Sequence, residues 1–169
     1  ISCLCPCGTT GEMLYLQDAE KSEIIRKTVQ FAGSKASVMA GVWALKAEDT
    51  NALAKQAEKD GASGVFLPPP IYYPANDEVI YHWYASVRRA TSLPLFAYNI
   101  PGYASNAISH PCVERLTAEG IIQGIKDSTG KPDQMTSLVK QFGDRIVIEA
   151  ASDGFVLEAR EIGANGFIS

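Results

Sequence analysis

One helix-to-strand junction occurs twice in this chain. Residues 61–64 read Gly-Ala-Ser-Gly and residues 163–166 read Gly-Ala-Asn-Gly, and each is followed by an apolar run. We expect the first glycine to take the left-handed conformation that ends a helix, and the second to let the next strand pass close to its neighbour. Repeated junctions of this kind are typical of βα units, whose parallel strands are buried on both faces.

Short apolar runs alternate with longer helical patterns along the whole chain. The apolar runs predict seven strands, at residues 2–7, 36–42, 64–67, 95–98, 121–125, 146–148 and 166–168. The longer patterns predict six helices, at residues 18–32, 47–59, 77–90, 110–118, 131–142 and 154–162. The alanine-rich segment 47–59 combines high helix propensity with apolar positions that approximate a 3.6-residue period.

Strict alternation of strands and helices leaves two architectures, an open doubly wound sheet and a closed (β/α)8 barrel. The dinucleotide-binding open sheet requires Gly-x-Gly-x-x-Gly after its first strand, and Gly-Thr-Thr-Gly-Glu at residues 8–12 does not supply it. A barrel carries its functional residues at the carboxyl ends of several strands. Polar residues occur at those positions, namely Thr9, Thr10, Tyr98, Lys126, Ser152 and Asp153.

The predicted barrel is incomplete. Seven strands are one short of closure, and a barrel of this type usually needs about 250 residues, whereas the chain has 169. We therefore expect an α/β fold, a (β/α)8 TIM barrel that lacks its first strand and its C-terminal helices. Residues 1–169 would form a single partial barrel domain.

Composition and charge exclude several other classes of protein. The chain is 46% hydrophobic and 20% charged, which is ordinary for a protein with a packed core. Its net charge of −4 offers no basic surface to nucleic acid or to an anionic membrane. It has neither an apolar run of the ~20 residues that would cross a bilayer nor the pattern of a signal peptide. We expect a cytoplasmic protein with no nucleic-acid or membrane partner.

The cysteines and histidines do not indicate a metal site. Alternation at Cys3, Cys5 and Cys7 would put three thiols on one face of a strand, whereas zinc sites use Cys-x2-Cys spacing and a second ligand pair. We expect small apolar strand residues in a reduced compartment. His82 and His110 fall in predicted helices, where surface or packing roles are expected, so we predict no metal site.

Three features at predicted strand ends can carry chemistry. Lys126 ends an apolar run, where desolvation penalises its ammonium form and favours the amine that attacks a carbonyl, unless the side chain extends to solvent. Tyr98 could relay a proton or simply pack. Residues 8–11, Gly-Thr-Thr-Gly, could surround a carboxylate with backbone N–H groups and the hydroxyls of Thr9 and Thr10, or could form a plain turn.

Three motifs together resemble one family. Gly-Thr-Thr-Gly-Glu at residues 8–12, Tyr-Asn-Ile-Pro at 98–101 and Gly-Ile-Lys-Asp-Ser at 124–128 are similar, in order, to signatures of the dihydrodipicolinate synthase/N-acetylneuraminate lyase family. Residues 163–169 resemble that family's eighth strand, so the chain would carry strands 2 to 8 of the family barrel. The resemblance implies a class I, pyruvate-dependent aldolase that works without a cofactor and assembles as a homotetramer.

The resemblance also implies roles for individual residues. Lys126 would form a Schiff base with pyruvate or a 2-keto-3-deoxy acid, Tyr98 would move the proton through a relay that includes Thr10, and Thr9 and Thr10 would hold the pyruvate carboxylate. Ile168, in the segment similar to the last strand, is grouped with the substrate-binding residues.

The aldehyde partner is a separate question. Synthases of the family carry an arginine shortly after the Tyr-Asn-x-Pro motif, and residues 102–106 contain none. Tyr103 cannot replace a bidentate guanidinium. Pro-Ile-Tyr-Tyr-Pro at residues 70–74 is closer to 2-keto-3-deoxygluconate aldolases, so Tyr72 and Tyr103 are expected to offer hydroxyls to a sugar-like substrate. Tyr72 could also pack at a subunit contact.

The sequence therefore favours an aldolase that acts on 2-keto-3-deoxy sugar acids. The alternatives are a dihydrodipicolinate synthase that condenses pyruvate with aspartate semialdehyde, an inactive truncated barrel, and a protein that only binds a keto acid.

Overall fold

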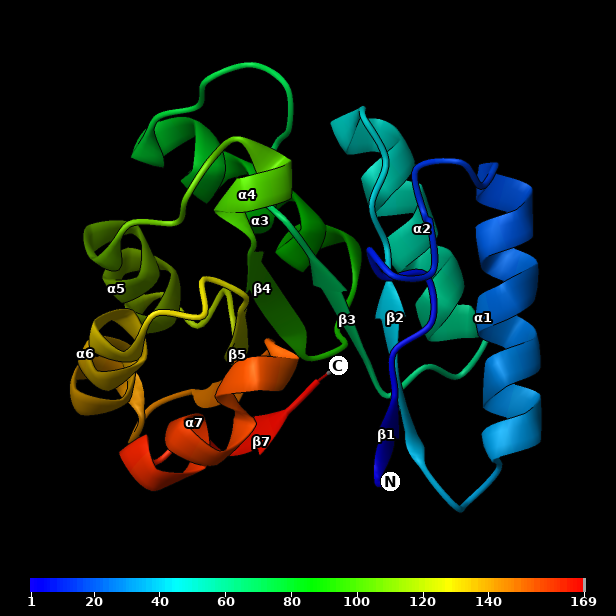
Figure 1. The fold of residues 1–169 in the computed structure, drawn as a ribbon. Coiled ribbons are helices and arrows are strands. Elements are labelled where there is room, and N and C mark those ends of the chain that lie inside the picture. Colours follow the sequence, from blue (N-terminus) through cyan, green and yellow to red (C-terminus); the bar gives the residue numbers. More distant parts are fainter. Residues whose placement is uncertain (169) are drawn as a thin grey trace. The chain divides into compact units, whose positions relative to one another are not determined.

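The computed structural model describes residues 1–168 as an alternation of parallel strands and helices (Figure 1). The strands are β1 Cys3–Leu4, β2 Ser37–Gly41, β3 Gly64–Leu67, β4 Leu95–Asn99, β5 Gly124–Asp127, β6 Val147–Ala150 and β7 Gly166–Phe167. The α-helices are α1 Asp18–Ala32, α2 Ala47–Lys59, α3 Asp77–Ala90, α4 Pro101–Ala104, α5 His110–Ala118, α6 Pro132–Phe142 and α7 Val156–Ile162, with a 3-10 turn at Asp153–Phe155.

The chain divides into two compact units, each with its own sheet segment. The first unit comprises Ile1–Leu67 and Ser86–Leu95. Within it β1, β2 and β3 pair in parallel, with Met39 opposite Gly64. Helices α1 and α2 lie side by side and pack on β2 and β3 (Figure 1). The prediction of a single domain for residues 1–169 stays a prediction.

The second unit comprises Pro68–Ala85 and the chain from Phe96 onward. Its strands pair in parallel in the order β4, β5, β6, β7. Helices α6 and α7 pack against each other, and α6 also contacts β6 (Figure 1). The apolar positions of the helices face the strands, because an amphipathic helix buries one stripe. Met135, Leu138 and Phe142 of α6 are accordingly almost fully buried.

The repeated junction behaves as predicted at its first glycine. Gly61 and Gly163 have φ of +86° and +111°, in the region that side chains rarely adopt, and each follows a helix. The second glycine serves a more specific purpose than expected. A Cβ on Gly64 would overlap Sδ of Met39, and one on Gly166 would overlap the carboxylate of Glu149. These glycines make room for a side chain of the neighbouring strand.

Several predicted elements are confirmed to the residue, among them the helices at 18–32, 47–59, 77–90 and 110–118. The strand predicted at 121–125 is present, but it starts three residues later than predicted and ends at Asp127. Ile121 and Ile122 close the turn after α5, since both N–H groups donate to the Leu116 carbonyl, at 2.9 and 3.4 Å. Strand β5 starts only at Gly124, so Lys126 lies inside the strand. The short helix α4, which begins at Pro101, was not predicted.

The cysteine pattern near the N-terminus also differs from the prediction. Strand β1 ends at Leu4, so three thiols do not share one strand face. Cys7 lies in the following turn with a φ of +59°. It is buried, and burial raises the pKa of its thiol to about 11, so the thiol behaves as an apolar packing group.

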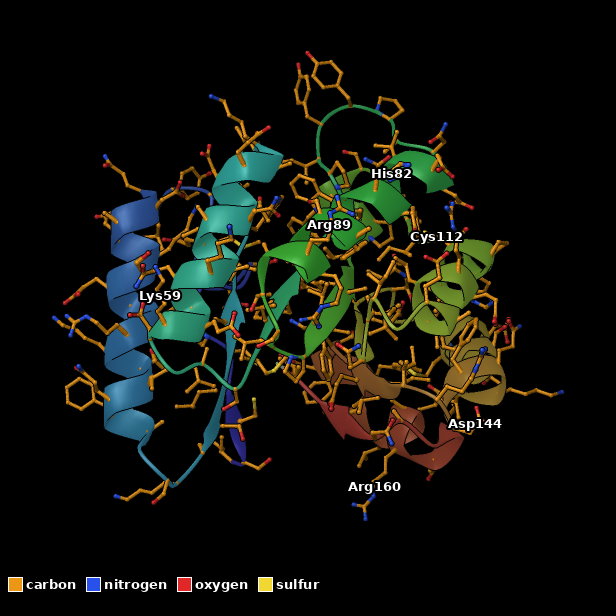
Figure 2. All side chains as sticks on the ribbon, turned by 180° about the vertical axis from the view of Figure 1, so that it is seen from behind. Lys59, His82, Arg89, Cys112, Asp144 and Arg160 are labelled. Atoms are coloured by element: carbon orange, nitrogen blue, oxygen red, sulfur yellow. The ribbon has the colours of Figure 1, made fainter. Side chains whose placement is uncertain are left out.

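The two histidines lie in helices, as predicted, and the surface and packing roles expected of them are both present. His82 extends from α3 at the surface, where its Nε2 pairs with Glu78 at 2.9 Å (Figure 2). His110 starts α5 and packs edge-on against Phe142, with ring centroids 5.9 Å apart. Its Nδ1 lies 3.3 Å from the Ser137 hydroxyl.

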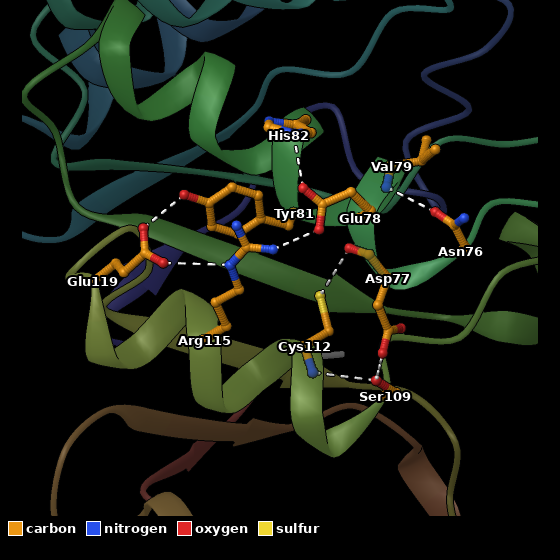
Figure 3. Close-up of polar contacts among 10 residues, drawn as sticks. All are labelled: Asn76, Asp77, Glu78, Val79, Tyr81, His82, Ser109, Cys112, Arg115 and Glu119. Atoms are coloured by element: carbon orange, nitrogen blue, oxygen red, sulfur yellow. Dashed lines mark hydrogen bonds and ion pairs between the residues drawn. The ribbon is translucent and has the colours of Figure 1, made fainter.

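A polar network joins α3 to α5 within the second unit (Figure 3). The Arg115 guanidinium donates to Glu78 at 2.6 Å and to Glu119 at 3.3 Å, and it lies 3.4 Å above the ring of Tyr81. The Tyr81 hydroxyl donates to Glu119 at 2.6 Å. These contacts lower the pKa of Glu78, mainly through Arg115, and that of Glu119, through Tyr81 first and Arg115 next.

The starts of the same two helices are joined beside this network (Figure 3). Ser109 caps α5 by accepting from the Cys112 N–H at 3.2 Å, and its hydroxyl donates to Asp77 at 2.6 Å. The Cys112 thiol is directed at the Asp77 carbonyl, 3.8 Å away, and burial raises its pKa to about 12. The network therefore fixes both the starts and the exposed flanks of α3 and α5.

We predict that Arg115→Gln lowers the melting temperature near pH 7 and that the difference from wild type shrinks as the pH falls to near 3. A carboxyl whose pKa is lowered in the folded state contributes stability above its ordinary pKa and loses it on protonation. Thermal unfolding followed by circular dichroism across this range tests it. Arg160→Gln, on a side chain that points into solvent from α7 (Figure 2), is the control. An equal difference at every pH would contradict the prediction.

Candidate active site

Lys126 and Tyr98 come together on adjacent strands of the second unit. They are register partners of β5 and β4, and paired residues of parallel strands project from the same face of the sheet. The Lys126 Nζ lies 4.1 Å from the centroid of the Tyr98 ring. Only 8% of Lys126 and 3% of Tyr98 are exposed. A lysine and a phenol thus share a buried position, an arrangement that imine chemistry with proton transfer can use.

Ser128 joins this pair and was missed by sequence reasoning. Its hydroxyl donates to the Tyr98 hydroxyl at 3.4 Å. A signal for it exists, since residues two apart on a strand face the same side, and Ser128 lies two residues beyond Lys126. The phenol therefore has a hydroxyl neighbour at the residue that directly follows the lysine's strand.

The opposite faces of β4 and β5 are held by a buried amide–carboxyl pair. The Asn99 Nδ2 donates to Asp127 Oδ2 at 2.7 Å, and its Oδ1 accepts from the Ile108 N–H at 3.1 Å. Asp127 Oδ1 accepts from the Thr129 N–H at 3.1 Å. Asn99 and Asp127 are 1% and 2% exposed. Asn99 directly follows Tyr98 in the chain, and Asp127 directly follows Lys126. The Asn99–Asp127 pair therefore fixes the register that aligns Tyr98 with Lys126.

Thr9 and Thr10 lie in a turn of the first unit. The Glu12 N–H donates to the Thr9 carbonyl at 3.0 Å, Thr9 is half-buried and Thr10 is exposed. The preceding segment rests directly on β2, because the Gly41 N–H donates to Pro6 at 3.0 Å and a Cβ on Gly41 would collide with the Cys7 carbonyl. Binding of a carboxylate by these threonines stays a prediction.

Tyr72 and Tyr103 lie at the surface of the second unit and are 78% and 76% exposed. Tyr72 has a φ of +75° and packs edge-on against Tyr73, with ring centroids 4.9 Å apart. Asn106 holds this loop, since its Nδ2 donates to the Pro70 carbonyl at 2.7 Å and to that of Tyr73 at 2.9 Å. The loop is ordered by these bonds, and contact of either tyrosine with substrate stays a prediction.

Ile168 follows β7 and is half-buried. Its N–H donates to the Ala150 carbonyl at 2.9 Å, which continues the β6–β7 pairing beyond the strand. Its contact with substrate stays a prediction.

A further titratable residue, Glu149, shares the register row of Tyr98 and Lys126 and was not predicted. It is the partner of Lys126 on β6. It is half-buried, and desolvation raises the pKa of its carboxyl. The reason it was missed is that the sequence of β6 offers no motif around it.

Comparison with known sequences identifies the family. All of residues 1–169 match the family described as the dihydrodipicolinate synthetase family. The chain belongs to the dihydrodipicolinate synthetase family. A 4-hydroxy-tetrahydrodipicolinate synthase from Psychrobacter arcticus is 36% identical over 167 residues, which cover 99% of this chain and 56% of that protein. The chain thus spans about half the length of the curated relatives it matches.

Comparison with solved structures confirms the fold. The dihydrodipicolinate synthase DapA-2 of Bacillus anthracis superposes with a TM-score of 0.94 at 30% identity, over 99% of this chain and 57% of that one. A 2-keto 3-deoxygluconate aldolase from Picrophilus torridus superposes with a TM-score of 0.92 at 28% identity, over 99% of this chain and 61% of that one. The prediction of an incomplete TIM barrel is confirmed. No helix among residues 1–168 is long and apolar enough to cross a membrane.

We predict that Asn99→Ala lowers the free energy of unfolding by on the order of 3 kcal/mol, because it leaves a buried Asp127 oxygen and the Ile108 N–H without their partner. Asn76→Ala is the matched control, since this exposed amide caps α3 by accepting from the Val79 N–H at 3.0 Å and should cost about 1 kcal/mol. Chemical denaturation of both variants measures the two losses. Equal losses of unfolding free energy would mean that the buried Asn99–Asp127 pair stabilises the protein no more than an exposed helix cap does.

Proposed function

We propose that this chain carries the imine-forming half of a class I, pyruvate-dependent enzyme that forms or cleaves a carbon–carbon bond. The observation that carries the proposal is the buried Lys126 amine, 4.1 Å from the Tyr98 ring on the adjacent strand. Membership of the dihydrodipicolinate synthetase family supports it. A protein that only binds a keto acid would not need an amine at this position.

The proposed cycle begins when the Lys126 amine adds to the 2-keto carbon of pyruvate. The carbinolamine loses water and becomes an iminium, in which a carbon–nitrogen double bond replaces the carbonyl. The iminium accepts the electron pair left when a proton leaves C3, and the resulting enamine attacks the aldehyde carbon. Water then hydrolyses the product imine and restores the amine. No metal or nucleotide takes part.

The other site residues have supporting roles in this proposal. Tyr98 transfers the protons, and its hydroxyl is kept in position by Ser128 at 3.4 Å. Thr9 and Thr10 bind the pyruvate carboxylate, as the family resemblance implies, and Thr10 extends the proton relay. Tyr72, Tyr103 and Ile168 contact the aldehyde partner.

Of the two candidate reactions, the synthase reaction is better supported. The relatives that match almost the whole chain at 32–36% identity are named 4-hydroxy-tetrahydrodipicolinate synthase. We therefore propose condensation of pyruvate with aspartate semialdehyde. This reverses the order that the sequence analysis gave, because one absent arginine weighs less than similarity over 99% of the chain.

Cleavage of 2-keto-3-deoxy sugar acids is the second candidate. Residues 102–106 contain no arginine to pair with the carboxylate of the semialdehyde, and the exposed Tyr103 offers a hydroxyl instead. The 2-keto 3-deoxygluconate aldolase with a TM-score of 0.92 supports the same direction. A homotetramer and a cytoplasmic location also remain proposals that follow from the family.

We predict that borohydride reduction in the presence of pyruvate adds one pyruvyl unit to the wild-type protein and none to Lys126→Ala. Intact mass measurement after reduction gives the result, and peptide mapping locates the adduct. Lys131→Ala, at an exposed lysine just before α6, is the control and should still be labelled. An adduct that persists in Lys126→Ala would place the chemistry elsewhere.

Tyr98→Phe separates imine formation from proton transfer in the same assay. The variant keeps the ring and should still be trapped by borohydride, while turnover falls by roughly 10²–10⁴-fold. Near-normal turnover would remove Tyr98 from the mechanism.

We predict faster condensation of pyruvate with aspartate semialdehyde than cleavage of 2-keto-3-deoxygluconate. Steady-state rates of both reactions, measured on the full-length protein, decide between the two candidates. If the semialdehyde carboxylate meets no charged partner, its reaction loses a few kcal/mol and sugar-acid cleavage is faster, which would reverse the assignment.

A further inference from the structure

The nitrogen of Lys126 lies over the face of the Tyr98 ring, 4.1 Å from the ring centroid. An aromatic face carries partial negative charge and attracts a cation within about 6 Å of its centroid. The contact is fixed by register, because the two residues are partners on β4 and β5 and project from the same face of the sheet. The nitrogen that the proposed cycle converts into a cation therefore already rests on an aromatic face.

Burial strengthens this contact. Both Lys126 and Tyr98 are almost fully buried, and a ring face attracts a cation most strongly where water does not compete. A second pair in the same unit shows the contrast. Arg115 lies 3.4 Å over the ring of Tyr81, but its side chain is 43% exposed and its charge is paired with Glu78. The buried pair is therefore the one in which the ring carries electrostatic weight.

The carboxylates of the neighbouring strand positions are directed away from the contact. Asp127 follows Lys126 on β5 and so projects to the opposite face of the sheet. Glu149, the partner of Lys126 on β6, leans toward β7, where its carboxylate occupies the space that a Cβ on Gly166 would fill. The ring face is therefore the electrostatic partner that the structure places against the nitrogen.

Helix α3 contributes one titratable group behind the ring. Tyr84 is fully buried, and its hydroxyl is hydrogen-bonded to the backbone of Tyr98. Desolvation raises the pKa of this phenol well above its ordinary value, so the group stays neutral. Tyr84 thus holds the backbone that carries the ring and adds no charge of its own.

We propose that the face of the Tyr98 ring binds the positive charge of the protonated imine that forms on Lys126. This inference rests on the proposed function, and it is separate from the proton transfer assigned to the Tyr98 hydroxyl. The imine withdraws electrons only while its nitrogen carries a proton. When a proton leaves C3, the electron pair of the C3–H bond forms the C2–C3 double bond, and the π pair of the C–N double bond moves to nitrogen and cancels its charge. The ring keeps the imine in the protonated form that this step uses.

Fluorination of the ring tests this, because fluorine makes the ring face less negative while the ring keeps its shape. Phenylalanine, 3,5-difluorophenylalanine and 3,4,5-trifluorophenylalanine are placed at position 98 of the full-length protein, so no member of the series has the hydroxyl. Each protein is incubated with pyruvate and cyanoborohydride, which reduces the protonated imine, and intact mass gives the fraction labelled at each pH. We expect the alkaline limb of the profile, where the imine loses its proton, to move to lower pH with each step, by about one pH unit for the trifluorinated ring.

Matched variants separate the ring from the hydroxyl. Tyr98→Phe keeps the ring and should have its alkaline limb close to that of wild type. Tyr98→Leu keeps an apolar side chain without an aromatic face and should shift like the trifluorinated ring, which replaces it if the leucine variant does not fold. Trifluorophenylalanine at the 85% exposed Phe31, in the Tyr98→Phe background, should leave the limb unmoved. A purely structural role would lower labelling at every pH without moving the limb.

The outcomes distinguish this inference from the function on which it rests. A wild-type protein that gains no pyruvyl unit overturns the proposed function and the role of the ring together. Normal labelling of wild type with an alkaline limb at the same pH throughout the fluorinated series overturns the role of the ring alone. A Tyr98→Phe limb shifted as far as that of Tyr98→Leu would assign the effect to the hydroxyl and likewise overturn it.

Discussion

The in-register parallel pairing of β4, β5, β6 and β7 is the constraint on which the site depends. A slip of one residue would turn each paired side chain to the other face of the sheet, and Lys126 would lose both Tyr98 and Glu149 as neighbours. The pairing is reinforced on the far face, where Asn99 donates to Asp127 at 2.7 Å. The buried Asn99–Asp127 pair takes no part in the proposed reaction, but it fixes the relative positions of Tyr98 and Lys126.

Glycines make room for large side chains of the neighbouring strands. Gly124 lies beneath the ring of Phe96, Gly64 beneath Met39 and Gly166 beneath Glu149. A large side chain fits within the sheet only because its neighbour has no Cβ. The same arrangement that makes room for Met39 at Gly64 makes room for the Glu149 carboxylate at Gly166.

Much of the fold could be predicted because its signals are local. A helix such as Ala47–Lys59 is encoded by its own period and by the glycine that follows. The start of the strand predicted at 121–125 was placed too early because Ile121 and Ile122 are as apolar as strand residues, while their N–H groups close the turn after α5. Composition cannot distinguish these two uses of isoleucine.

The sequence by itself determined the βα alternation, the family motifs and the choice of Lys126 and Tyr98, since each depends on residues close together in the chain. Ser128 could also have been predicted, because it lies two positions from Lys126, directly after the end of β5. Only the tertiary structure brought Glu149 into the row of the lysine. The physical reason is that register between strands joined through a helix is a non-local property, fixed by packing and buried hydrogen bonds, and no short segment encodes it.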